Sequence, residues 1–162
     1  MTSIFTSHVE RFNKLYNLPV NKLPTIPFAK SAELGSVKEQ LINRLRRFAD
    51  ILTEEVTEVT QIIDKVEAGD SPSEVLTDIA DWLGDMQIYC ASEMLKFGLD
   101  NDMVLDIIMA SNMSKLGADG LPVYDARGKV LKGPGYWPPE SQILRYIIAA
   151  QRMAAKEAAN KQ

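Results

Sequence analysis

The sequence predicts an all-α protein, a helical bundle with a short irregular or hairpin segment over residues 118–138. Three observations predict it. Helix start signals recur along the chain, apolar residues recur at steps of three and four over long stretches, and glycines and prolines gather in one C-terminal segment. The 162 residues suit one globular domain, and no change of composition suggests a linker. We therefore expect a single domain over residues 1–162.

The first half of the chain predicts two helices. The stretch from Ser7 to Glu10 has the spacing of a capping box and predicts a short helix to about Tyr16. Residues 17–35 hold three prolines and predict an ordered loop. A second capping box, from Ser36 to Glu39, and a stop signal at Gly69 predict one long amphipathic helix between them.

The next helix has the sharpest start signal. The stretch from Ser71 to Glu74 supplies a capping serine, a proline at the first helical position and a reciprocal glutamate. This helix is predicted to run to about Phe97 and to end at Gly98. A further helix is predicted from near Asn101 to Gly117.

The C-terminal part contains a segment rich in turn-forming residues and one more helix. Residues 118–138 contain several glycines and prolines and predict a small hairpin around residues 126–128. From Pro139 an alanine-rich helix is predicted to continue toward a charged tail.

Composition excludes several classes of function. The formal net charge of -4 argues against a broad nucleic-acid interface. One cysteine excludes an intrachain disulfide framework and a multi-cysteine zinc site, and the single histidine, His8, excludes mechanisms that need two. No apolar run is long enough to span a bilayer, and no secretory leader is recognisable at the start. We expect a cytoplasmic protein without a membrane partner.

Acidic residues interrupt the apolar face of the helix predicted over residues 36–69. At about 100° per residue, an apolar stripe contains Glu55, while Glu58 and Glu54 lie progressively toward its edge. A carboxylate that faces a bundle core is unfavourable unless it is protonated, ion-paired or bound to a metal. This position therefore predicts a partner for Glu55.

The helix predicted from Ser71 repeats the anomaly. Asp78, Asp81 and Asp85 follow steps of three and four and so share one face of a helix that is otherwise nearly apolar. Two buried helices with acids in line are expected to face each other and form an acidic pocket.

The alternative is that both acid rows are solvated faces, with salt bridges to basic residues such as Arg44, Arg46, Arg47 or Lys65. If the pocket exists, its oxygen ligands favour hard cations, Mg²⁺ or Mn²⁺. The di-iron carboxylate bundle needs two Glu-x-x-His pairs, which a chain with one histidine lacks.

These residues resemble the all-α nucleoside triphosphate pyrophosphohydrolases, the MazG-like superfamily, whose members include dimeric dUTPases and phosphoribosyl-ATP pyrophosphohydrolase. The hallmark of the family is a Glu-(Glu)-x-x-Glu on one helix and a Glu-x-x-Asp on the next. The stretch from Glu54 to Glu58 matches the first motif well. The stretch from Gly84 to Tyr89 looks like the continuation of the second, which makes Asp85 the matching aspartate.

The second motif departs from the family pattern. Trp82 stands where the glutamate is expected, and Asp81, one turn before Asp85, offers a replacement carboxylate. In the other register, Asp78 and Asp81 form the pair, with aspartate in place of glutamate. We prefer Asp81 and Asp85 as ligands, with Asp78 as the third candidate, and the register stays open.

Further stretches extend the resemblance over nearly the whole chain. Asn112 and Lys115 look like the family's Asn-x-x-Lys, which binds the substrate's phosphates. The segments 128–139 and 9–13 look like the compact MazG-like dUTPase branch. The acid motifs alone are short and moderately specific; all the segments in order are more so.

The resemblance implies Mg²⁺-dependent hydrolysis of a nucleoside triphosphate, a deoxynucleotide or non-standard nucleotide, at the α-phosphorus to a monophosphate and pyrophosphate. Triphosphate and acidic pocket repel each other without a cation, so metal dependence follows from the chemistry. We assign Glu55, Glu58, Asp81 and Asp85 as metal ligands and Glu54 as the base that activates water. Glu54 and Glu55 can exchange these roles.

The substrate side is assigned to residues nearer the C-terminus. Asn112 and Lys115 are expected to bind phosphates. The alternative is a structural role, in which the lysine at the end of a helix complements the helix dipole. Lys129 and Lys132 are expected to close over the phosphates, from the same chain or a neighbouring subunit, unless they are simply exposed. Tyr136 is expected to stack on a base or to anchor its segment.

The sequence is also compatible with two other functions. One is phosphoribosyl-ATP hydrolysis, although that enzyme is typically shorter and lacks a segment like 118–138. The other is a non-catalytic module that binds a nucleotide or dimerises, and Trp82 is its best support. Because a few long helices with apolar residues on several faces cannot bury all of them alone, we expect a homodimer or a dimer-of-dimers tetramer.

Overall fold

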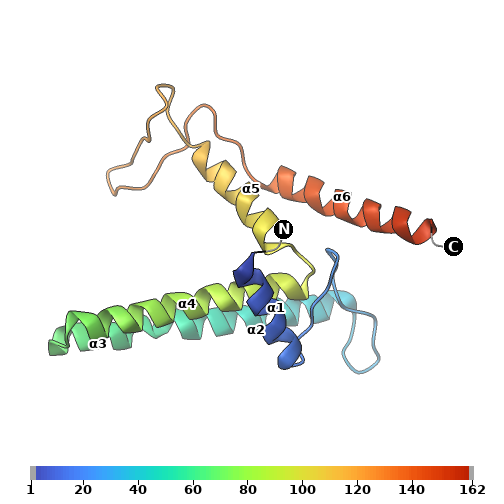
Figure 1. Cartoon of the computed structure of the whole chain (residues 1–162), viewed down its shortest axis with the longest axis horizontal. Helices are drawn as coiled ribbons and strands as arrows, with labels where there is room; N and C mark the ends of the chain where they lie inside the picture. Colours follow the sequence, from blue (N-terminus) through green and yellow to red (C-terminus); the bar gives the residue numbers. More distant parts are fainter. Residues whose placement is uncertain (1–2, 161–162) are drawn as a thin grey trace.

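The computed structural model describes residues 3–160, which form an all-α structure (Figure 1). Its helices are α1 (Ile4–Leu15), α2 (Val37–Thr57), α3 (Val59–Ala68), α4 (Pro72–Lys96), α5 (Asn101–Met113) and α6 (Glu140–Ala159). β pairing in this part of the chain is limited to two isolated bridges, Ser31 with Gly35 and Tyr124 with Val130. The predicted fold class is confirmed. None of the helices in residues 3–160 combines the length and apolarity that a membrane span requires.

The first helix begins earlier than the sequence predicts. Ser3, and not Ser7, is the N-cap, and its hydroxyl accepts a hydrogen bond from the Thr6 amide. The reason is a distant contact, because the Asp102 carboxylate accepts bonds from the Ser3 amide and hydroxyl, both at 2.7 Å. Glu10, which was predicted to complete the capping box, instead forms ion pairs with Lys14 and Lys22, and each ammonium lies 2.6 Å from its Oε1.

The single helix predicted between Ser36 and Gly69 is divided at Glu58 into α2 and α3. The capping box of Ser36 and Glu39 is confirmed, and Gly69 ends α3 with a left-handed φ of 85°. At the junction the Glu58 amide donates to the Glu55 carbonyl at 3.2 Å, a tighter bond than the α-helical pattern. The Thr57 hydroxyl donates to backbone carbonyls one turn back, which bends helices.

Helix α4 follows its prediction closely. Ser71 and Glu74 form a reciprocal capping box, and Pro72 occupies the first turn. The helix ends at Lys96, and Gly98 adopts a left-handed φ of 67°. The loop before α2 lies against this end, since the Thr25 amide donates to the Phe97 carbonyl at 2.9 Å.

Helix α5 ends at Met113, earlier than the predicted stop at Gly117. Ser114 terminates it by bonding back to Ser111 and by accepting a bond from the Trp137 amide at 3.2 Å. The chain then forms the predicted small hairpin, in which the Leu131 amide donates to the Val123 carbonyl at 2.7 Å.

Helices α2 and α3 follow each other end to end, and α4 lies alongside both, so that the three form a rod (Figure 1). Helix α1 packs across α4, and α5 leaves the rod and carries the following loops and α6 away from it. The buried apolar cluster consists of Val9, Ala91 and Leu95, where α1 crosses α4. Buried Asn13 reinforces this crossing by accepting a 2.7 Å bond from the Ser92 hydroxyl and donating to the Ser92 carbonyl. The buried core of the described chain therefore centres on the crossing of α1 and α4, whereas α2 contributes no buried residue to it.

Candidate functional site

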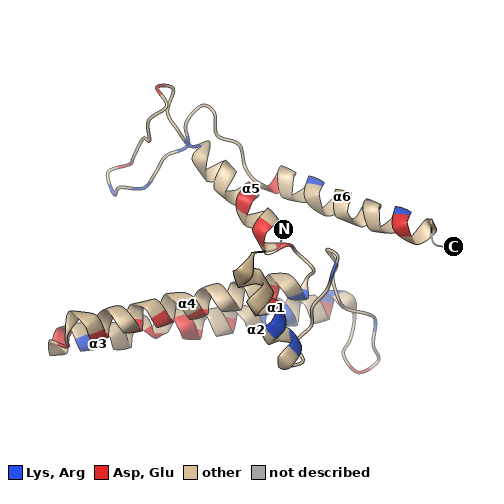
Figure 2. Cartoon of the chain, viewed as in Figure 1, with Lys and Arg blue, Asp and Glu red and all other residues tan. Residues whose placement is uncertain are grey.

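The rod carries the predicted acids on both of its layers. Figure 2 shows acidic residues recurring along α2, α3 and α4, while basic residues gather at the end of the rod near α1. The junction of α2 and α3 supplies Glu54, Glu55 and Glu58. Helix α4 packs on both helices and supplies Asp78, Asp81 and Asp85.

Glu55 is the unusual member of this set. Its Oε2 atom is buried and has no hydrogen-bond partner among the described residues. Burial raises the pKa of Glu55, and the charges of Glu58, Asp85 and Glu54 raise it further, whereas Tyr89 acts in the opposite direction by hydrogen bonding. An unpartnered buried carboxylate oxygen costs free energy, so this atom is poised to accept a cation or a proton.

Asp85 and Tyr89 face Glu55 from α4. Burial raises the pKa of the Tyr89 hydroxyl, and the negative charges of Glu55, Asp85 and Glu58 add to the shift. The two α4 residues are four positions apart and so lie on one helix face. Glu55, Glu58, Asp85 and Tyr89 therefore act on one another electrostatically across the two layers of the rod.

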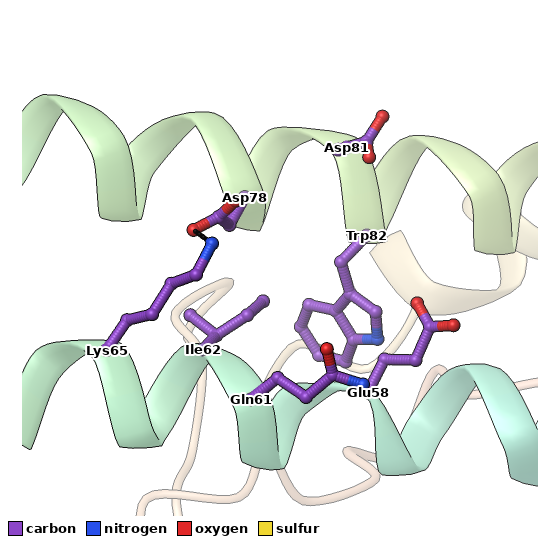
Figure 3. A pocket seen from close by; sticks show the side chains of 7 residues that line it. All are labelled: Glu58, Gln61, Ile62, Lys65, Asp78, Asp81 and Trp82. Carbon is purple, nitrogen blue, oxygen red and sulfur yellow. Dashed lines mark hydrogen bonds and ion pairs between the residues drawn. The ribbon is translucent and has the colours of Figure 1, made fainter.

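A polar pocket of about 150 Å³ adjoins this group (Figure 3). Glu58, Gln61, Ile62 and Lys65 line it from the α3 side, and Asp78, Asp81 and Trp82 from α4. The Lys65 ammonium and the Asp78 carboxylate form an ion pair at 2.7 Å across it. Asp78 thus already has a cationic partner, as the alternative of acid rows with salt bridges expected for such residues.

Trp82 fills the gap between the two layers, between Glu58 and Asp81 (Figure 3). Its indole N–H donates to the Glu55 backbone carbonyl at 2.7 Å. The indole thus ties α4 to the α2–α3 junction. In Figure 3 the Asp81 carboxylate lies on the side of α4 away from Glu58, and the residue is exposed.

Within residues 3–160, no three histidine, cysteine, aspartate or glutamate side chains converge closely enough to hold a metal ion as they stand. Glu54 is exposed and lies next to Glu55 at the end of α2. The charges of Glu58, Asp85 and Glu54, all three exposed, act on Glu55. Asp78 and Asp81 line the adjoining pocket.

The residues predicted to bind phosphates lie elsewhere in the chain. Asn112 is at the end of α5, and its Oδ1 accepts a 2.7 Å bond from the Lys115 ammonium. Lys132 lies over the Tyr136 ring, 4.5 Å from its centroid, in the loops beyond α5, and Lys129 lies in the same segment. Figure 1 shows these loops well away from the α2–α3 junction, so one chain does not bring them to the acids.

Sequence reasoning missed two features of the site. The first is Tyr89, which lies next to Glu55. Its spacing of four residues from Asp85 places both on one face of the helix and could have indicated it. An apolar pocket of about 640 Å³ lies beside the acids between α1, α2 and α4, and Asp85 and Tyr89 are among its lining residues. The spacing of apolar residues within one helix does not predict this pocket, because its walls come from three helices far apart in the sequence.

Comparisons with known proteins add one likeness. No protein-family model matches the chain, and neither does any curated protein. Among solved structures, the chain is similar to a protein from Exiguobacterium sp. 255-15 that is provisionally described as an NTP pyrophosphohydrolase. The TM-score is 0.47 and the sequence identity 20%, over 96% of this chain and 99% of that chain. A likeness at this identity and TM-score does not assign an activity to this chain.

Proposed function

We propose that the protein is a metal-dependent nucleoside triphosphate pyrophosphohydrolase. The observation that carries this proposal is the buried, unpartnered Oε2 atom of Glu55, with the charges of Glu58 and Asp85 acting on it. A buried carboxylate oxygen beside the exposed acids Glu58 and Asp85 is electrostatically costly, and perturbed groups of this kind cluster at functional sites. A bound cation would relieve the repulsion between these carboxylates. It would also allow the negatively charged triphosphate to approach the acidic residues.

The donor set fits Mg²⁺ or Mn²⁺, because every group is a hard oxygen ligand. Glu55, Glu58 and Asp85 are the residues that would hold the ion, and Asp81 stays a predicted further ligand. Such an ion, when bound, supplies charge neutralisation of the phosphates and a lowered pKa of a coordinated water. Glu54, which is exposed and next to Glu55 in the chain, is the residue we propose as the base that would accept the proton of the attacking water.

We also propose that a second copy of the chain completes the site. Asn112, Lys115, Lys129 and Lys132 are the predicted phosphate ligands, yet in one chain they lie beyond the end of α5. Among residues 3–160 the Lys115 ammonium bonds to the neutral Asn112 amide and forms no ion pair, so its charge is available to a phosphate. A homodimer, or a tetramer built from two dimers, would bring the loops of one copy to the acids of the other.

Hydrolysis in ¹⁸O-labelled water tests the reaction directly. The purified protein is incubated with deoxynucleoside triphosphates and Mg²⁺, and the products are identified by mass spectrometry. Attack at the α-phosphorus places the label in the monophosphate and leaves the pyrophosphate unlabelled. Label in the pyrophosphate, or release of inorganic phosphate, contradicts the proposal.

Variants connect the reaction to the site. We expect Glu58→Gln and Asp85→Asn each to lower kcat/KM by about 100-fold or more while the helical circular dichroism is unchanged, because even outer-shell partners of a metal are worth 10–100-fold. Asp50→Asn, which removes an exposed acid from α2, is the matched control and is expected to retain activity. Wild-type turnover in Asp85→Asn would show that the reaction takes place elsewhere.

One observation favours a second candidate, a non-catalytic nucleotide-binding module. Trp82 occupies the position of an expected ligand, and its indole fills part of the space between Glu58 and Asp81. Such a module binds nucleotide without forming product. Calorimetric binding together with unchanged nucleotide after prolonged incubation would support this candidate against the first.

A further inference from the structure

The apolar pocket beside the acids has two chemically different ends. Its walls are formed mainly by Phe5, Phe12, Phe48, Ile88 and Tyr89, from α1, α2 and α4. Asp85 marks the end next to the proposed metal site. The other end is lined by Arg44, Arg47 and Lys96, so the aromatic walls lie between an acidic end and a basic end.

Two of these cations already share a partner. The Arg44 guanidinium donates to both oxygens of Glu93, to Oε1 at 2.7 Å, and the Lys96 ammonium donates to Oε2 at 3.2 Å. The Glu93 side chain is only 8% exposed. Burial works against its ionisation, but the Arg44 and Lys96 charges lower its pKa on balance.

Arg47 is left with its charge uncompensated. It lines the same end of the pocket, is exposed, and forms no ion pair with any residue in the range 3–160. Burial lowers the pKa of Lys96, and the positive charges of Arg44 and Arg47 lower it further, which places Arg47 in the same cluster. Three cations against one carboxylate leave this end positive.

The distance between the two ends suits one nucleoside. Glu55, at the proposed metal site, and Arg47, at the cationic end, are eight residues apart on α2, which corresponds to about 12 Å along the helix axis. A substrate whose phosphates lie at the acids extends its sugar and base along the aromatic walls. The edge of the base that is farthest from the sugar then reaches the cations.

The cationic end offers donors and few free acceptors. Guanidinium and ammonium groups only donate hydrogen bonds. The carboxylate of Glu93 is occupied by Arg44 and Lys96, and the Ser92 hydroxyl donates to Asn13 while its carbonyl accepts from the same side chain. A carbonyl oxygen on the base finds free donors at this end, whereas an amino group meets the Glu93 carboxylate already occupied by Arg44 and Lys96.

We propose that this pocket holds the base of the substrate and that Arg47 selects bases whose far edge carries a carbonyl oxygen, such as uracil and hypoxanthine, over the corresponding amino bases, cytosine and adenine. This inference rests on the proposed function. Aromatic walls supply stacking that every base shares, so the discrimination falls to the charged end. An amino group facing Arg47 leaves donors on both sides without an acceptor.

Matched nucleotide pairs test the preference. Steady-state kcat/KM for pyrophosphate release is measured with dUTP against dCTP and with dITP against dATP, because each pair differs at the far edge of the base. We expect the carbonyl member of each pair to be favoured by roughly tenfold or more. Arg47→Met keeps the aliphatic stem and removes the donors, and we expect it to bring both ratios close to one by slowing the carbonyl substrates.

Arg46→Met is the control, because Arg46 is the neighbouring residue on α2 but lines a separate groove with Glu33 and Glu39. It is expected to leave both ratios unchanged. Equal rates within the pairs, a preference for the amino bases, or an unchanged ratio in Arg47→Met would overturn the inference. A preference for amino bases would point to His8, which also lines the pocket and carries a nitrogen acceptor.

A binding experiment separates this inference from the proposed function. Calorimetry with deoxyuridine and deoxycytidine, without Mg²⁺, measures base recognition in the absence of phosphates and hydrolysis. Tighter binding of deoxyuridine, lost in Arg47→Met, supports the inference even if no nucleotide is hydrolysed. Equal binding of the two nucleosides, or binding of neither, overturns it even if hydrolysis is confirmed.

Discussion

At the scale of single residues, the proposed site depends on a carboxylate one of whose oxygens has no hydrogen-bond partner in the described chain. The Oε2 atom of Glu55 is buried without a hydrogen bond, and its neighbours Glu58 and Asp85 are also negative. The sequence predicted this position, because Glu55 interrupts an apolar stripe. It did not predict how Trp82 would lie, since only the packed helices show that the indole bonds to the Glu55 carbonyl.

The pH dependence of stability follows from the raised pKa of Glu55. A carboxyl group whose pKa is higher in the folded state stabilises the fold below its unfolded pKa, and this contribution is lost as the pH rises through the folded pKa. At pH 7 without divalent cations, we therefore expect Glu55→Gln to melt roughly 2–4 °C above wild type, and we expect the difference to shrink in acid.

Thermal melts at several pH values measure this effect, and added Mg²⁺ supplies the second half of the prediction. The cation is expected to raise the Tm of wild type and not that of Glu55→Gln, since only wild type keeps the full donor set. A variant that melts below wild type at pH 7 without metal would show that the carboxylate is stabilising in the apo fold.

At the scale of elements, local signals predicted the rod better than its ends. The capping boxes at Ser36 and Ser71 are both confirmed, because their donors and acceptors are close in sequence. The start of α1 was missed because Asp102, far along the chain, holds Ser3. The break at Glu58 was missed because amphipathic periodicity continues through it.

Two glycines near α4 are expected to respond oppositely to alanine. Gly84 lies within the helix with open space around it, so Gly84→Ala is expected to stabilise by up to about 1 kcal/mol. Gly98 has a φ of +67°, and an added Cβ would lie 1.9 Å from the Leu23 carbonyl oxygen. Gly98→Ala is expected to destabilise by well over 1 kcal/mol.

Urea unfolding followed by circular dichroism measures both variants. The same sign for the two would mean that the loop over the end of α4 is not packed as described, or that Gly84 lies in a contact that tolerates no methyl group.

At the scale of the whole molecule, the chain leaves many apolar side chains in solvent. Met103, Leu105, Met109 and Met113 on α5 are between 47% and 65% exposed, and Leu144 and Met153 on α6 are 56% and 63% exposed. Such a surface is typical of an interface. Sequence patterns predicted this excess of apolar faces, but they contain no information on how a second copy would meet them.

Sedimentation equilibrium tests the assembly. We expect a mass of two or four times the 18.1 kDa chain, and we expect Met109→Glu on the exposed face of α5 to shift the population toward smaller species. A wild-type mass equal to one chain would exclude the proposal that a neighbouring copy supplies Lys115 and the loop lysines.

Binding of Mn²⁺, followed by electron paramagnetic resonance of the free ion, tests the central claim most directly. When Mn²⁺ is titrated into the wild-type protein, the signal of the free ion is expected to stay below that of a protein-free control until the site is saturated. Asp85→Asn is expected to lose most of this binding, and Asp50→Asn is expected to keep it. Binding that is absent in wild type, or equally strong in Asp85→Asn, would contradict a cation site between the α2–α3 junction and α4.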